Sequence, residues 1–107
     1  MFLDFPKAFK EVEPVPGWKI HVFAGERLSF SRMTLKPDTE AAMHTHSNEQ
    51  MGIILEGQFE MKIGDETRLL GKGDMYHVAS NINHGGFTHA RGAQILDVFS
   101  PPRDYKK

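Results

Sequence analysis

Two histidines and a carboxamide lie close together in the segment His44-Thr45-His46-Ser47-Asn48-Glu49-Gln50. Imidazole is the commonest protein ligand for a divalent transition metal. Residues of equal parity share one face of an extended strand, so His44, His46 and Gln50 could all point into one cavity. His84, well downstream at the end of another strand-like segment, is a fourth candidate ligand. The pattern predicts a metal site built from three imidazoles and one amide.

Glu49 is the rival of Gln50 for the fourth ligand position. Its odd number turns its side chain away from the histidine pair if the strand is regular, so we favour Gln50. Three neutral imidazoles and a neutral amide would leave the full dipositive charge on the metal. Such a centre is a strong Lewis acid, which favours polarisation of an anionic substrate over redox chemistry.

Short strands and turns make up most of the chain. Alternating or apolar runs between Gly, Pro and Asp predict strands at Trp18 to Phe23, Arg27 to Leu35, Gln50 to Leu55, Gln58 to Ile63, Thr67 to Leu70, Met75 to Val78, Gly86 to Ala90 and Ala93 to Phe99. Glu56-Gly57 is expected to end a strand, and Gly64-Asp65 to form a hairpin turn. We expect no amphipathic helix of more than a turn or two. The fold class is therefore all-β, a sandwich or barrel.

A chain of 107 residues is expected to form one domain with its own core. Residues 1–17 carry three prolines before Gly17 and should form an irregular or edge-like N-terminal arm. Residues 25–100 should form the barrel, and residues 101–107 a C-terminal tail that could cross its mouth. A small barrel has strand edges to protect, which favours a homodimer.

Charge and composition exclude several classes of function. The formal net charge of -1 gives no electrostatic reason to expect nucleic acid or an anionic membrane as partner. The chain has no cysteine, which excludes disulfides, thiolate chemistry and Cys-type zinc sites. Residues 1–16 mix charges with prolines and lack the continuous apolar stretch of a signal peptide or membrane span. We therefore expect a cytoplasmic protein.

The sequence resembles the cupin superfamily of small antiparallel β-barrels, also called double-stranded β-helices or jelly rolls. The residues that match its two motifs are His44, His46, Gln50 and Gly57 in the first and Gly73-Asp74 and Asn83-His84-Gly85 in the second. The resemblance covers about residues 25 to 100. It implies one divalent transition metal ion (nickel, zinc, manganese or iron) bound by His44, His46, Gln50 and His84.

A narrower resemblance is to KdgF-type cupins, a group associated with pectin and alginate breakdown. It is carried by the C-terminal run Ile95 to Arg103 and by Gln50, where many cupins have Glu. The group converts cyclic 4,5-unsaturated monouronates into linear ketonised sugars. The resemblance implies a small anionic sugar as substrate, with Asp97 as the catalytic residue and Phe99 and Arg103 as substrate-binding residues.

Asp97 also stands out on physical grounds. A lone carboxyl in an apolar strand is costly to bury unless it is paired, hydrogen bonded or used. Acting first as base on the C1 hydroxyl and then as acid at C4 of the enolate, one carboxylate could carry both proton transfers, typically worth ~10²–10⁴-fold. Arg103 could bind the substrate carboxylate. Alternatively, Asp97 could hold a backbone group or an arginine, Phe99 could be core packing, and Arg103 could be a solvated surface charge.

Three functions from different classes remain open. The first is a metal-dependent enzyme that opens and ketonises unsaturated uronate rings. The second is a non-catalytic cupin that binds a small acid or a metal, and the third is a metal-dependent oxygenase or lyase of the cupin type. The C-terminal run favours the first. His21, His77 and His89 lie outside the motifs and are interpreted as strand or surface residues, although His77 could line the cavity.

Overall fold

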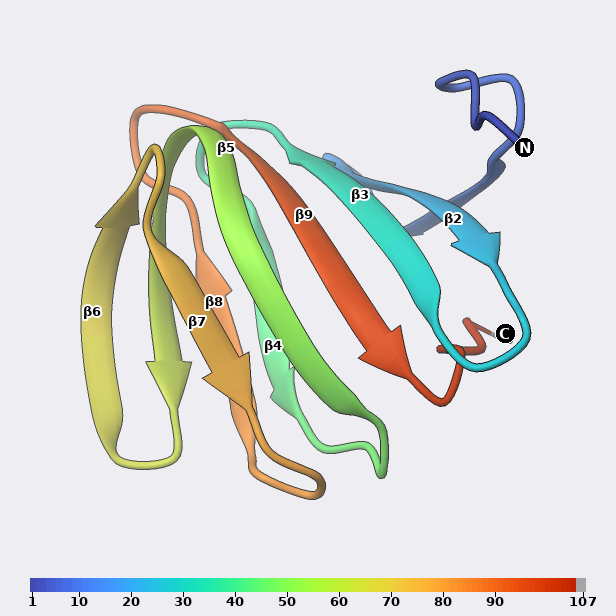
Figure 1. The fold of residues 1–107 in the computed structure, drawn as a ribbon. Helices are drawn as coiled ribbons and strands as arrows, with labels where there is room; N and C mark the ends of the chain where they lie inside the picture. Colours follow the sequence, from blue (N-terminus) through green and yellow to red (C-terminus); the bar gives the residue numbers. More distant parts are fainter. Residues whose placement is uncertain (106–107) are drawn as a thin grey trace.

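Antiparallel strands account for all the regular secondary structure in residues 1–105, the part of the chain that the computed structural model describes (Figure 1). The nine strands of these residues are β1 (Lys10–Val15), β2 (Trp18–Ala24), β3 (Ser29–Leu35), β4 (Glu40–His44), β5 (Glu49–Ile63), β6 (Glu66–Gly71), β7 (Met75–Val78), β8 (His84–Phe87) and β9 (Ala93–Ser100). The predicted all-β fold class is confirmed. Within the same residues, no helix is long and apolar enough to cross a membrane.

The long strand β5 belongs to both halves of the barrel. Its first half pairs with β9 and β7, and its second half pairs with β8 and β6. From β9 the sheet continues through β3 and β2 to the edge strand β1, and from β8 it continues to β4. Figure 1 shows how this single sheet curls on itself. Residues far apart in sequence thereby face one another across the interior.

A bulge in β5 allows the strand to pass from one half to the other. The ladder with β9 shifts register between Ile54 and Glu56, and Gly57 has a φ of 80°. A Cβ at Gly57 would overlap the carbonyl oxygen of Gly92, so only glycine fits this position. The prediction that Glu56-Gly57 ends a strand is therefore wrong. The strand continues, because a bulge bends and twists it without ending its hydrogen bonding.

The bulge also exchanges the faces of β5. Before it the even-numbered residues Gln50 and Ile54 are buried, and after it the odd-numbered Phe59 and Met61 are buried. The predicted common face of Phe59, Met61 and Ile63 is confirmed, and so is the two-residue turn that joins β5 to β6.

Strand β4 was not predicted as a separate element. Its centre is Ala41 and Ala42, and alanine is a weak strand former, so the pattern carried little signal. Strand β8 begins at His84 and ends at Phe87, where a strand from Gly86 to Ala90 was expected. At the next residue the Thr88 hydroxyl accepts from the backbone N–H of Thr39 at 2.9 Å and donates to the carbonyl oxygen of Lys36 at 2.6 Å.

The N-terminal segment was expected to be irregular or edge-like. Lys10–Val15 forms the edge strand β1, which pairs only with β2 among the described strands. At the other end, residues 101–105 of the tail lie beyond β9, and Lys106 and Lys107 lie outside the described residues. The apolar core forms between the two halves and includes Ile20, Leu35, Ile54, Val78 and Ile95, all less than 3% exposed.

Candidate metal centre

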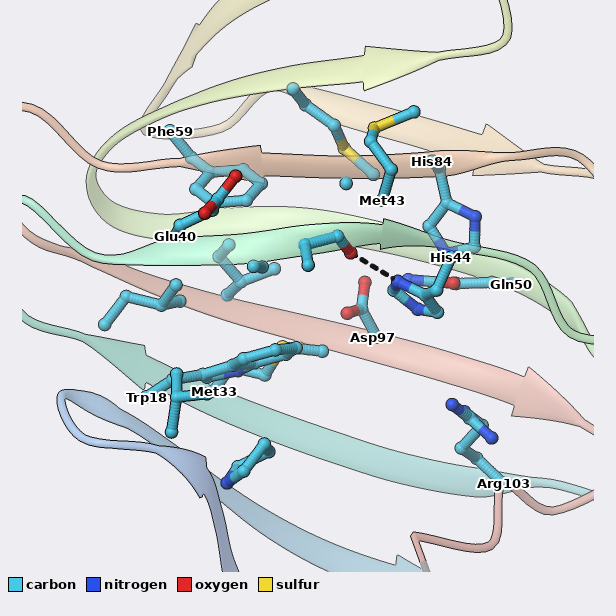
Figure 2. Close-up of a pocket in the computed structure, with 18 of the residues that line it drawn as sticks. Trp18, Met33, Glu40, Met43, His44, Gln50, Phe59, His84, Asp97 and Arg103 are labelled. Atoms are coloured by element: carbon cyan, nitrogen blue, oxygen red, sulfur yellow. Dashed lines mark hydrogen bonds between the residues drawn. The ribbon is translucent and has the colours of Figure 1, made fainter.

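A cavity of about 450 Å³ lies between the two halves of the barrel. Figure 2 shows one part of the cavity in which His44, Gln50, His84 and Asp97 point toward one another. The opposite part is lined mainly by large apolar side chains that include Trp18, Met33 and Phe59, and Glu40 lies beside Phe59.

Three histidines form a cluster in the polar part of the cavity. One ring nitrogen from each of His44, His46 and His84 lies within 4.8 Å of the other two. His44 ends β4 and pairs with His84 at the start of β8, which places their ring centroids 4.4 Å apart. His46 lies in the loop before β5, with its ring centroid 4.8 Å from that of His84. This group could hold a metal ion.

Backbone carbonyls orient all three imidazoles in the same way. The Nδ1 atoms of His44, His46 and His84 lie 2.9, 3.1 and 2.8 Å from the carbonyl oxygens of Ala42, Asn48 and Ile82. A carbonyl oxygen only accepts, so each Nδ1 carries the proton and each Nε2 presents a lone pair. The Nε2 of His84 is buried and has no hydrogen-bond partner within residues 1–105. The unpartnered Nε2 of His84, beside the Nε2 atoms of His44 and His46, is the arrangement that a set of metal ligands requires.

The protonation of two of these histidines also suits a metal. Burial lowers the pKa of His84 to about 4, and the neighbouring histidines and Arg103 act in the same direction. Burial and the positive charge of Arg103 lower the pKa of His46. Both rings are therefore neutral at pH 7, as metal binding demands.

Gln50 is buried and contacts the cluster, whereas Glu49 does not. The Oε1 of Gln50 lies 3.1 Å from the Nε2 of His46. With its proton on Nδ1, His46 presents a lone pair to this oxygen, so two acceptors face each other, and a cation between them would satisfy both. Glu49 points outward, where its carboxylate lies 2.6 Å from the Nε2 of His77.

The route by which these residues meet differs from the prediction. His44 and His46 do not share a strand with Gln50, because a bend over residues 45–48 separates β4 from β5. Parity in β5 correctly separates Gln50 from Glu49, but the two histidines converge through the bend. The roles of these residues as ligands stay predictions.

Asp97 lies beside the cluster and is 1% exposed. Its Oδ1 accepts a hydrogen bond from the hydroxyl of Tyr76, and its buried Oδ2 has no partner in residues 1–105. Burial raises the pKa of Asp97 to about 7, although the hydrogen bond from Tyr76 and the nearby amide of Gln50 act to lower this pKa. Figure 2 shows the carboxyl pointing toward His44 and Gln50.

The first residues of the C-terminal tail return to the barrel and place Arg103 at the cavity. Asn48 donates from Nδ2 to the carbonyl oxygen of Pro101 at 2.7 Å, and the backbone N–H of Arg103 donates to the hydroxyl of Ser29 at 2.9 Å. The Arg103 guanidinium lies over the ring of Tyr105, 4.9 Å from its centroid, and lines the cavity. No ion pair involves Arg103 among residues 1–105.

Phe99 is 2% exposed and lies under the cluster, with its ring centroid 5.5 Å from that of His46. It both lines the cavity and supports a candidate ligand. The remaining histidines lie elsewhere: His77 bonds to Glu49, His89 to Glu60 at 2.9 Å, and His21 to Glu11 at 3.3 Å. His77 is on the outer face of β7 and does not line the cavity.

Sequence reasoning missed Tyr76, Asn48 and Tyr105. Gly52 could have indicated that a residue such as Tyr76 lies close, because this glycine interrupts an otherwise apolar stretch of β5. A strand glycine often marks the close approach of a neighbouring group. Asn48 and Tyr105 act through the fold of the loop and the tail, which no periodic pattern encodes.

Residues 31–99 match the family model described as a cupin domain. The pectin degradation protein KdgF of Dickeya dadantii (strain 3937) is 36% identical over 61 residues, which make up 56% of this chain and 56% of that protein. The match thus spans about half the length of this relative.

Two solved structures share the fold. A RmlC-like cupin from Shewanella frigidimarina NCIMB 400 has a TM-score of 0.86 and 22% identity, over 97% of this chain and 94% of that one. KdgF from Halomonas sp. has a TM-score of 0.83 and 22% identity, over 94% and 93% of the two chains. The family model matches more than half of the chain, and the curled antiparallel sheet agrees with it, so the chain belongs to the cupin family.

Proposed function

We propose that this cupin is a metal-dependent enzyme that promotes ring opening and ketonisation of 4,5-unsaturated uronate sugars. The observation that carries the proposal is the buried carboxyl of Asp97, which keeps one oxygen without a partner beside the three-histidine cluster. The likeness to a pectin degradation protein supports a uronate as substrate, since pectin is built from uronates.

In this proposal Arg103 binds the carboxylate of the sugar, because its guanidinium lines the cavity and has no ion-pair partner in residues 1–105. Phe99 packs beneath His46 and against the bound ring. Held by His44, His46, His84 and Gln50, one divalent ion would supply Lewis-acid stabilisation of a developing enolate oxygen.

Asp97 carries the proton. Its free oxygen accepts the proton of the C1 hydroxyl while the C1–O5 bond breaks, which leaves an aldehyde at C1 and an enolate at C5. The protonated carboxyl then returns the proton to C4, and the enolate becomes the C5 ketone. One proton leaves the substrate and one enters it, so no other reactant is needed.

The experiment is a turnover assay with metal-loaded protein and 4,5-unsaturated galacturonate, followed by the loss of the unsaturated-uronate absorbance. We expect the wild type to exceed the spontaneous rate and Asp97→Asn to fall by ~10²–10⁴-fold. Glu49→Gln is the matched control. It also removes a carboxylate, but the Glu49 carboxylate lies on the neighbouring strand β5 and faces away from the cavity. No acceleration by wild type with one metal ion bound would refute the proposal.

One observation favours the second candidate, a cupin that binds a small acid without turning it over. The part of the cavity lined by Trp18, Met33 and Phe59 is mainly apolar and would suit an acid with an apolar portion. Binding without turnover, unaffected by Asp97→Asn, would identify this function, and consumption of oxygen would identify an oxygenase. The cytoplasmic location and the homodimer stay predictions of the sequence.

A further inference from the structure

Three strands place Tyr76, Gly52 and Asp97 in one row across the inner face of the sheet. Gly52 on β5 pairs with Tyr76 on β7 on one side and with Asp97 on β9 on the other. Neighbours in such a row share a face of the sheet. Tyr76 therefore reaches Asp97 by lying across the strand between them, and its hydroxyl donates to Oδ1.

Gly52 makes this contact possible. A Cβ at Gly52 would overlap both the Oδ1 of Asp97 and the ring and hydroxyl of Tyr76. Any other residue would thus separate the two side chains. The glycine keeps open the space that the hydrogen bond occupies.

On the β3 side, the neighbour of Asp97 is engaged with another group. This neighbour is Ser31, whose hydroxyl is engaged with the hydroxyl of Tyr105 at 2.9 Å. Within residues 1–105, Oδ2 of Asp97 has no hydrogen-bond partner. The two oxygens of one carboxyl are therefore unequal, because Oδ1 is held and Oδ2 is open.

We propose that Tyr76 is the positioning residue of Asp97, fixing Oδ1 so that Oδ2 is the oxygen that faces the substrate. This proposal rests on the proposed function. Without the tyrosine hydroxyl the carboxyl can rotate about its bond to Cβ and exchange its two oxygens. Proton transfer depends strongly on such alignment, and a misplacement of about 1 Å can cost on the order of 10²-fold in rate. Tyr76 itself does not touch the reacting atoms.

The test is Tyr76→Phe, which removes the hydroxyl and keeps the ring over Gly52. We expect kcat for 4,5-unsaturated galacturonate to fall by about 10- to 100-fold. We expect KM to stay within about twofold, because Arg103 and the metal site are unchanged. Bound metal and the affinity for saturated galacturonate, measured by calorimetry, should equal those of the wild type. Thr88→Val is the matched control, since it removes a buried hydroxyl remote from the cavity.

Each outcome decides one question. An unchanged kcat in Tyr76→Phe would overturn the positioning role, while turnover by the wild type would keep the proposed function intact. Loss of metal or of galacturonate affinity together with kcat would also overturn it, because the tyrosine would then support the whole site. A wild type without turnover would refute the proposed function itself. A kcat loss equal to that of Thr88→Val would also overturn the positioning role, because the removal of a remote buried hydroxyl would then have the same effect.

Discussion

Replacing Asp97 by Asn should stabilise the metal-free protein at pH 8 while it removes the proposed proton carrier. Burial raises the pKa of this carboxyl from 3.8 to about 7. The folded state therefore resists ionisation more than the unfolded state does. The penalty is absent below pH 4, grows as the pH rises from about 4 to about 7, and is constant above that range.

The shift sets the size of the effect. From 3.8 to about 7 is roughly three pKa units, and at 1.36 kcal/mol per unit the penalty approaches about 4 kcal/mol. This is an upper value, because relaxation around the ion reduces it. The new amide keeps an oxygen for the Tyr76 hydroxyl but places an NH₂ where Oδ2 has no partner, which costs about 1–3 kcal/mol at every pH. The variant should thus gain at most about 1–3 kcal/mol at pH 8.

The assay is urea unfolding of wild type and Asp97→Asn in chelator, at intervals from pH 4 to pH 8. The difference between their free energies of unfolding isolates Asp97, because the other titrating groups are common to both proteins. This difference should move in favour of the variant by up to about 4 kcal/mol as the pH rises. A difference that does not change with pH would refute the reasoning, since the carboxyl would then ionise as it does in the unfolded chain.

Three other predictions follow from the metal centre, the bulge and the strand edges. His84→Asn should lose the bound divalent ion while Glu49→Gln keeps it, as measured by metal content after dialysis. In the wild type, a metal concentration of 100 times Kd should raise the free energy of unfolding by about 2.7 kcal/mol. Gly57→Ala should lower Tm strongly because of its φ of 80° and the overlap with Gly92, whereas Gly71→Ala, with nothing within 4 Å of its Cβ, should change Tm little; equal Tm values would contradict this account of the bulge. Sedimentation should find a homodimer, and a monomer at all concentrations would remove that prediction.

Much of the fold could be predicted because period-two alternation is a direct consequence of strand geometry. In β9 the residues Ile95, Asp97 and Phe99 are buried together, as their equal parity requires. The same rule separates Gln50 from Glu49 in β5. It fails at Glu56-Gly57, because a bulge changes parity without ending the strand, and composition alone does not distinguish a bulge from a turn.

The residues of the site could be predicted from the sequence, but the backbone conformation that brings them together could be predicted only in part. Histidine spacing led to His44, His46 and His84, yet the bend that joins them depends on pairing between β4 and β8, a non-local contact. The alignment of the three rings depends on backbone carbonyls two residues away, which any side chain could supply. Such features are properties of the folded backbone, so the sequence does not display them.

The energetic position of Asp97 is itself an argument for function. A carboxyl that is 1% exposed and has one oxygen without a partner lowers stability at neutral pH, and any small apolar residue would avoid this penalty. The neighbourhood is nevertheless arranged around it, with Gly52 clearing the space and Tyr76 holding one oxygen. The presence of this carboxyl beside three imidazoles is best explained if the free oxygen acts on a ligand in the cavity.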